Sequence, residues 1–261
     1  MGQLAVFVST GPASHDLAFE AEMLGSAADG RVSLTVSSWQ GPVVVLGYGQ
    51  PVEDVDLAWC RGRRIPVLRR LSGGTGVIHR DDLSVSLALP RSHPWSEGIV
   101  GLYDRFLDIL LPALRAAGSR VDRVVRAGRS TKVRSPVCFE HQLVDTLVVG
   151  GRKAVGCSQA RRRGGVLIHA AVLLGLDASL YAGAFRVDEQ RIAASLAPSL
   201  SGVDAPTASA TVVAEFGRAL DLEPVWRERP TPGRDALAVY DLERWAPVPD
   251  GGIRPRTAEL E

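Results

Sequence analysis

Hydrophobic spacing divides the chain into helical and extended segments. Apolar residues return every three or four positions over residues 15–29 and 98–117, which predicts two amphipathic helices, the second being the longest in the chain. Weaker patterns of the same period predict shorter helices at residues 52–62, 187–197 and 207–220. Alternating or continuous apolar runs predict strands over residues 31–38, 43–48, 65–70, 83–89, 143–149, 153–159 and 166–174.

Glycine-containing breaks indicate how some strands connect. Gly41-Pro42 separates the first two runs and predicts that they pair with each other, and Gly150-Gly151-Arg152 joins residues 143–149 and 153–159 as a hairpin. No repeat, low-complexity linker or shift of composition marks a second complete domain. We therefore expect an α+β fold, a single mixed β-sheet packed with helices plus a short helical C-terminal appendage. Residues 1–220 would form this domain, and residues 221–261 a tail without an independent fold.

Composition narrows the class of protein. The 261 residues are 46% hydrophobic and 23% charged, with a mean hydropathy of +0.07, as in a soluble globular protein. No apolar run approaches the roughly 20 residues of a membrane span, and the N-terminus lacks the basic region of a signal peptide. Three cysteines without metal-ligand spacing argue against a disulfide framework or a metal site. We expect a cytoplasmic protein without a metal.

Positive charge is concentrated in the middle of the chain. Residues 119–163 hold 11 basic and 3 acidic residues, a net charge of +8, whereas the whole chain carries +1. This distribution indicates a local acidic partner or a phosphate rather than general nucleic-acid affinity. Of the 30 basic residues, 28 are arginines, so the two lysines, Lys132 and Lys153, raise the question of whether a compact ammonium is needed there.

A glycine-rich segment is the first candidate for chemistry. Arg69-Arg70-Leu71-Ser72-Gly73-Gly74-Thr75-Gly76 follows a predicted strand and precedes His79. The glycines let backbone approach a ligand closely, and the arginines can neutralise an anion. A tight turn between the strand at residues 65–70 and a strand near Val77 explains the glycines equally well. The P-loop pattern is absent, because no Gly-Lys-Ser/Thr follows.

Two further candidates lie in the basic middle. Lys153 begins a predicted strand and is either a solvated edge charge, the more frequent case on spacing alone, or a group that points into a site. Cys138 follows six basic residues within 120–134, and an electropositive surrounding favours a reactive thiolate. A lone cysteine is more often a small buried hydrophobe. His141 and His169 are candidate bases, but their distance along the chain does not show whether they lie near Cys138.

The order of these motifs resembles the biotin/lipoate protein ligase superfamily. The run Leu46-Gly47-Tyr48-Gly49-Gln50 comes first, then Arg69–Gly74 with His79, then Gly151-Arg152-Lys153-Ala154-Val155-Gly156 with Gln159 and His169. The similarity extends over about residues 15–220. Cys138 with Phe139, followed 15 residues later by Lys153, is similar to the cysteine-dependent octanoyltransferases of lipoate biosynthesis. Cys157-Ser158, Thr75 and Ala170 depart from the usual residues, which affects the expected shape of the acyl pocket.

The resemblance implies the biotin/lipoate ligase catalytic fold and an acyltransferase. Cys138 would carry an octanoyl group as a thioester, and Lys153 would stabilise the thiolate and the developing oxyanion. The donor would be octanoyl-acyl carrier protein, and the acceptor a lysine of a lipoyl domain, in the glycine cleavage H protein or a 2-oxoacid dehydrogenase. No cofactor is implied. The substrate-binding residues would be Arg69, Arg70, Ser72, Gly73, Gly74, Gly76, His79, Gly156, Gln159 and His169. The basic segment 120–134 would dock the acidic carrier.

Two other functions remain open from the sequence. An ATP-dependent lipoate–protein ligase would use Lys153 and the basic middle to bind the phosphate of an adenylate, with ATP and Mg²⁺ as co-substrates and Cys138 incidental. A degenerate member that only binds acylated domains is a third interpretation, against which the presence of both Cys138 and Lys153 argues. An already modified lipoyl protein could replace the carrier as the donor. Chain length of the acyl group, preferred acceptor and oligomeric state are not distinguished.

Overall fold

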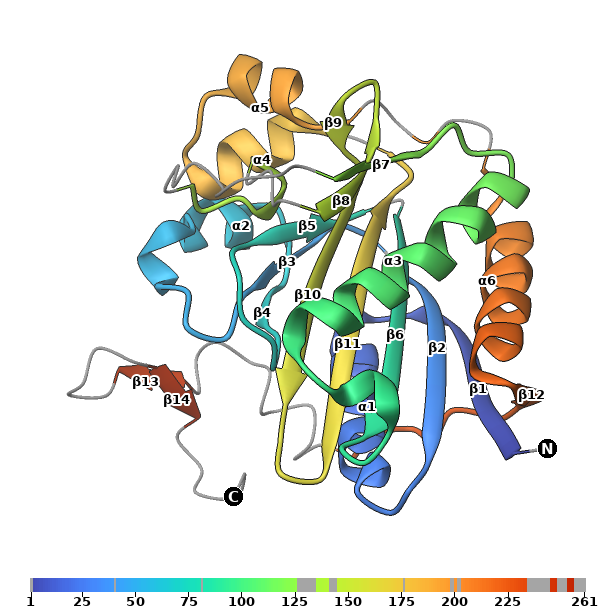
Figure 1. Ribbon diagram of the computed structural model, residues 1–261. Coiled ribbons are helices and arrows are strands. Elements are labelled where there is room, and N and C mark those ends of the chain that lie inside the picture. Colours follow the sequence, from blue (N-terminus) through green and yellow to red (C-terminus); the bar gives the residue numbers. More distant parts are fainter. Residues whose placement is uncertain are drawn as a thin grey trace.

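A six-stranded mixed sheet forms the centre of the protein in the computed structural model (Figure 1). The structure describes residues 2–39, 41–80, 82–125, 135–140, 145–175, 177–197, 200 and 203–233, and the backbone of 245–247 and 253–255. The strand order is β10-β11-β6-β2-β1-β12. β1 pairs in parallel with both of its neighbours, and the other pairs are antiparallel. The strands are β1 (Gly2–Gly11), β2 (Val32–Trp39), β6 (Asp82–Pro90), β10 (Val155–Arg161), β11 (Gly165–Leu173) and β12 (Leu222–Trp226).

Helices cover both faces of this sheet, as expected for an α+β domain. The helices α3 (Ile99–Ala116) and α6 (Ala205–Leu220) share one core with alternate residues of the strands, among them Leu83, Val85 and Leu87. Helix α1 (Ala13–Ala27) packs on the opposite face, against Ala88 and Leu167. The predicted amphipathic helices at residues 15–29 and 98–117 are confirmed, because their apolar stripes are the surfaces buried here.

Two smaller sheets flank the large one. The first has the order β4-β3-β5, from Val67–Arg69, Val43–Leu46 and Val77–His79, and the second has the order β7-β8-β9, from Asp122–Val125, Asp145–Val149 and Arg152–Lys153. The predicted pairing of residues 31–38 with 43–48 is wrong, since β2 lies in the large sheet and β3 in the first small one. Gly41, with φ of 68°, and Pro42 turn the chain from one sheet into the other.

Short helices complete the fold beside the first small sheet. They are α2 (Leu57–Gly62), α4 (Ala178–Phe185) and α5 (Glu189–Ser195), and single turns lie at Val52–Asp54, Pro94–Ser96 and Cys138–Glu140. The sequence pattern did not predict α4 or the strand β1. β12 lies beyond the boundary expected at residue 220 and pairs with β1 as the outer strand of the large sheet. Short strands β13 (Trp245–Pro247) and β14 (Ile253–Pro255) pair with each other. Within the described ranges, no helix is long and apolar enough to cross a membrane.

Candidate active site

Cys138 is held by a backbone bridge to the glycine-rich segment. The Gly76 amide donates to the Pro136 carbonyl at 2.8 Å, and the Cys138 amide donates to the Gly76 carbonyl at 2.8 Å. The side-chain amide of Gln50 also donates, through Nε2, to the Pro136 carbonyl at 3.0 Å. A Cβ on Gly76 would lie 2.4 Å from the Phe185 ring, so only glycine lets the backbone at position 76 pack this closely against Phe185. The bridge places Cys138 beside the loop that the sequence singled out.

Lys153 points inward and contacts Cys138. Its side chain is 1% exposed, its ammonium donates to the Cys138 carbonyl at 3.2 Å, and Nζ lies 3.7 Å from Sγ. Nζ also lies 5.3 Å from the centre of the Phe139 ring, where a cation is attracted by the aromatic face. The solvated-edge interpretation of Lys153 is wrong. β9 is only two residues long, and after Ala154 the chain enters the large sheet, so the β8–β9 hairpin directs this side chain into the molecule.

A cavity of about 500 Å³ runs along β10, the outer strand of the large sheet. The glycine-rich loop, β5, β11 and the start of α3 form its other walls, and Cys138 and Lys153 line it beside the first residues of β10. This volume lies within the roughly 300–1,000 Å³ range of small-molecule sites. The cavity therefore gives the Cys138–Lys153 pair room for a substrate.

The guanidinium of Arg70 shapes the glycine-rich loop from inside. It donates to the carbonyls of Gly73 at 2.7 Å and Thr75 at 3.0 Å, and to the Ser72 hydroxyl at 3.1 Å. Ser72 in turn shares a 2.7 Å hydrogen bond with Ser158 of β10, which ties the loop to the opposite wall of the cavity. Burial lowers the pKa of the Arg70 guanidinium. The glycine-rich segment does connect β4 to β5, as the alternative of a turn between these strands also predicted, but the two strands do not pair with each other and instead flank β3.

The predicted binding residues divide into those that line the cavity and those that support it. Arg70, Gly73, Gly74 and His79 line one side, and Gly156, Gln159 and His169 line the other. Arg69, Ser72 and Gly76 are not among the lining residues. Arg69 is fully buried and donates to the carbonyls of Gly47, Tyr48 and Gln50 at 2.6, 3.1 and 2.7 Å. Burial, together with the charge of Arg70, lowers its pKa to about 10.

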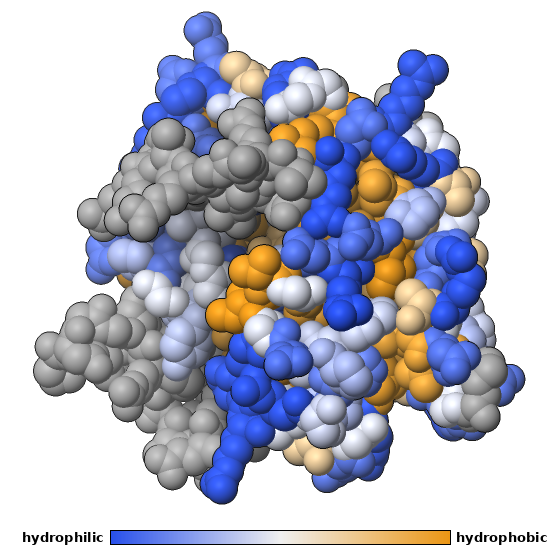
Figure 2. Space-filling view, viewed as in Figure 1, coloured by the Kyte–Doolittle hydropathy of each residue, from blue (hydrophilic) through white to orange (hydrophobic). Residues whose placement is uncertain are grey.

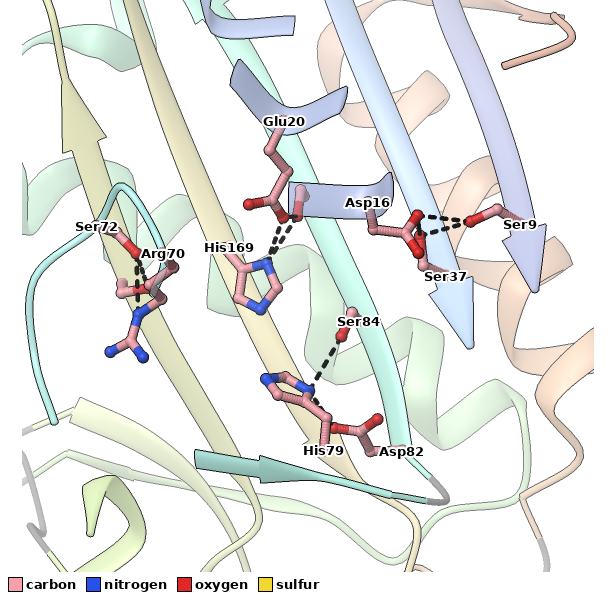
Figure 3. A network of polar contacts seen from close by, with 12 residues as sticks. Ser9, Asp16, Glu20, Ser37, Arg70, Ser72, His79, Asp82, Ser84 and His169 are labelled. Carbon is pink, nitrogen blue, oxygen red and sulfur yellow. Dashed lines mark hydrogen bonds and ion pairs between the residues drawn. The ribbon is translucent and has the colours of Figure 1, made fainter. Parts of the chain in front are cut away.

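Two buried histidine–carboxylate pairs face each other in the cavity wall (Figure 3). His169 Nδ1 lies 2.6 Å from Glu20 Oε1, and Ser86 donates to the same oxygen at 2.5 Å. His79 Nδ1 lies 2.6 Å from Asp82 Oδ2, and the two imidazole centres are 5.9 Å apart. Burial acts to raise the pKa of Glu20, but the charge of His169 and the hydrogen bonds from His169 and Ser86 outweigh it, so this pKa lies below its ordinary value.

Sequence reasoning missed the two carboxylates of these pairs. Glu20 interrupts the apolar stripe of α1, three residues after Leu17 and four before Leu24, and such an interruption is a usable signal of a buried polar contact. Asp82 follows His79 by three residues on the next strand. Tyr103, Ile99 and Arg161, which also line the cavity, carried no comparable signal.

Some predicted features lie elsewhere or outside the described residues. Arg126, Arg129, Lys132, Arg134 and His141 are not among the residues that the structure describes. Arg123 of the basic segment is described, and it forms ion pairs with Asp104 and Asp108 of α3. In the described part of the chain, no group of three or more histidine, cysteine, aspartate or glutamate residues could hold a metal ion.

Comparison with known proteins gives consistent matches. Octanoyltransferase LipM of Geobacillus kaustophilus (strain HTA426) is 30% identical over 197 residues, which cover 71% of each chain. Octanoyltransferase LipM of Moorella thermoacetica is 31% identical over 167 residues, which cover 62% of this chain and 61% of that one. A crystal structure of lipoate-protein ligase A bound with ATP superposes with a TM-score of 0.71 and 21% identity, covering 90% of this chain and 92% of that one.

The family description "Lipoyl protein ligase A/B catalytic domain" matches residues 12–216. That range contains the glycine-rich loop, Cys138, Lys153 and the whole cavity wall described above. The expected mixed-sheet fold is confirmed by the likeness to lipoate-protein ligase A. The chain belongs to the lipoyl protein ligase A/B catalytic domain family.

Proposed function

We propose that the chain is an octanoyltransferase that carries the octanoyl group on Cys138 as a thioester. The single observation that carries this proposal is the 3.7 Å approach of the Lys153 ammonium to the Cys138 thiol, in the wall of a cavity with room for an acyl chain. The relatives that match most of the chain are octanoyltransferases, which supports the choice of acyl group. The donor is octanoyl-acyl carrier protein, and the acceptor is a lysine of a lipoyl domain.

In the first step, the Cys138 thiolate attacks the carbonyl carbon of the donor thioester. The carbonyl electron pair moves to oxygen, and the Lys153 ammonium stabilises that charge because it is already held beside the reacting sulfur. Breaking the bond to the donor sulfur releases a thiolate, which takes up one proton in place of the proton that Cys138 gave up. No nucleotide or redox partner enters the step.

In the second step, the neutral amine of the acceptor lysine attacks the Cys138 thioester. An amide forms, the amine nitrogen releases one proton, and the Sγ of Cys138 leaves as a thiolate that Lys153 again stabilises by its charge. The thioester is more reactive toward the amine than an ester or amide would be, so a cysteine suits an intermediate that must be formed and consumed. The enzyme returns to its starting state.

The remaining described residues shape the cavity. Arg70 fixes the carbonyls of Gly73 and Thr75 and thereby the conformation of the loop that borders the acyl chain. Gly156 lies next to the reacting sulfur, since a Cβ there would be 3.6 Å from Sγ and 3.1 Å from the Phe139 ring. A side chain at position 156 would therefore crowd the thioester. Gly156 keeps this part of the wall open for the acyl carbonyl.

A transfer assay without nucleotide tests the proposal. Protein, octanoyl-acyl carrier protein and a lipoyl domain of the glycine cleavage H protein are mixed in the absence of ATP and Mg²⁺, and octanoylation of the lipoyl domain is followed by intact mass. The expected result is stoichiometric modification. A protein that modifies the lipoyl domain only when given lipoate and ATP would be a lipoate–protein ligase, and the proposal would be overturned.

A further inference from the structure

Four arginines gather at the hairpin that joins β10 and β11, and they are named here the hairpin arginines. Arg161 ends β10, Arg162 and Arg163 form the turn, and the Arg91 amide donates to the Gly164 carbonyl at 3.1 Å, which brings the end of β6 to the same place. The pKa of the Arg161 guanidinium is lowered by burial and by the neighbouring charge of Arg91. Positive charge is therefore concentrated at one end of the large sheet.

Among the described residues, the hairpin arginines have no acidic partner. Arg91, Arg162 and Arg163 are exposed, and none of the four forms an ion pair with any residue that the structure describes. Arg161 donates to the carbonyls of Ser96 and Gly98 and holds the start of α3. Unpaired positive charges that repel each other are costly to gather unless a negative partner meets them. Arg123, by contrast, is already paired with two aspartates.

Of the hairpin arginines, Arg161 lines the cavity, and it lies far along β10 from Cys138. Gly156 flanks the reacting sulfur, and Arg161 lies five residues further along the same strand, which corresponds to about 17 Å. A phosphopantetheine arm has 13 bonds between phosphorus and sulfur, and at the reach of an extended chain it spans about 15 Å. An arm of this length that runs from a thioester at Cys138 along β10 would bring its phosphodiester near Arg161.

An apolar patch lies beside the end of the cavity that Arg161 lines. Ile99 and Val100 at the start of α3 are 57% and 69% exposed, and Ile99 also lines the cavity. Figure 2 shows hydrophilic residues over the lower end of β10 next to a hydrophobic patch where α3 begins. An apolar centre beside a charged rim is the usual arrangement of a protein–protein interface.

We propose that the hairpin arginines, together with Ile99 and Val100, form the docking surface for an acidic carrier domain that delivers the octanoyl group on a phosphopantetheine arm. The inference rests on the proposed function and adds the place where the donor binds. Guanidinium groups pair with phosphodiester and carboxylate oxygens through charge-assisted hydrogen bonds, and long-range attraction raises the rate of encounter.

The test separates the two half-reactions in the double variant Arg162→Glu/Arg163→Glu. Acylation of Cys138 is measured at low and high salt with octanoyl-acyl carrier protein and with octanoyl-N-acetylcysteamine, a small thioester that lacks both carrier and phosphate. Transfer from preformed octanoyl-enzyme to the lipoyl domain is measured separately. The control is Arg31→Glu/Arg218→Glu, which makes the same change in net charge at two exposed side chains, at 68% and 74%, each of which forms an ion pair, with Asp29 and with Glu215.

With the carrier protein, we expect kcat/KM for acylation to fall about tenfold or more at low salt, and the loss to shrink as salt rises. Acylation by the small thioester, transfer to the lipoyl domain and the control variant should stay within twofold of the wild type. Unchanged acylation by the carrier protein would overturn the docking surface, as would a loss confined to transfer onto the lipoyl domain. Failure of the proposed function looks different, since the wild type itself would then never become acylated.

Discussion

Replacing Lys153 by methionine separates its electrostatic role from its packing. The side chain is 1% exposed and lies against the Phe139 ring, and methionine has a similar length without the charge. Two unit charges 3.7 Å apart interact by about 4 kcal/mol at an effective dielectric constant near 20. Loss of one such preorganised group costs about 10²–10³-fold in rate. We therefore expect Lys153→Met to acylate Cys138 about 10²–10³-fold more slowly.

We expect Lys153→Met to change the free energy of unfolding far less than it changes the rate of acylation. Methionine removes a buried charge, which is stabilising, and leaves the Cys138 carbonyl without this donor, which costs about 1 kcal/mol. Stability in urea should thus change by no more than about 1 kcal/mol. The assay is single-turnover acylation by octanoyl-N-acetylcysteamine, quenched and read by intact mass, with Lys153→Arg as a second variant that keeps charge but not shape. Lys153→Met acylating within tenfold of the wild-type rate would refute the electrostatic role.

Three further predictions concern residues around the same cavity. Cys60→Ser and Cys157→Ser should keep full acylation, because burial raises the pKa of these thiols to about 11 and about 12. Loss of the acyl-enzyme in either variant would contradict the assignment of Cys138 as the nucleophile. Glu20→Gln should unfold in urea at pH 7 with a free energy about 1–3 kcal/mol below that of the wild type, and this difference should shrink below pH 4.5, because a carboxylate with a lowered native pKa stabilises the fold above its ordinary pKa and loses that effect as pH falls. A difference that stays constant between pH 7 and pH 3 would argue against the pairing of Glu20 with His169. Gly47→Ala should lower the free energy of unfolding by about 1–3 kcal/mol and slow acylation, because its Cβ would lie 1.9 Å from the Gly74 carbonyl oxygen. Gly73→Ala, with open space around the added Cβ, is the control for stability, and equal melting temperatures for the two variants would contradict the close approach of Gly47 to Gly74.

The elements with a local origin were predictable from the sequence. The helix α3 follows from its 3.6-residue apolar period, and the β8–β9 hairpin from Gly150 and Gly151, because both signals lie within a few residues of the structure they specify. The pairing of strands was harder to predict from the sequence. β2 and β3 have similar β-branched sequences, and only the turn at Gly41 and the partners available elsewhere in the chain decide that they join different sheets.

In the candidate site, too, local features could be predicted from the sequence, and contacts between distant segments could not. Arg69 and Arg70 are neighbours, so alternation along the chain directs one guanidinium to the carbonyls of residues 47–50 and the other into the glycine-rich loop. Sequence alone did not indicate which of the two faces the cavity. The contact of Lys153 with Cys138 joins two small sheets through the Gly76 bridge, and its expectation came from the family resemblance and not from spacing.

Acylation of Cys138 tests the central claim most directly. The protein is mixed with octanoyl-acyl carrier protein, without ATP and without an acceptor, and its intact mass is recorded before and after neutral hydroxylamine. We expect the wild type to gain the mass of one octanoyl group that hydroxylamine removes, as for a thioester, Cys138→Ala to gain nothing, and Cys138→Ser to gain at most a slow, hydroxylamine-resistant ester. A wild-type protein that never gains this mass, yet modifies a lipoyl domain with lipoate and ATP, would contradict the account and assign Cys138 a structural role.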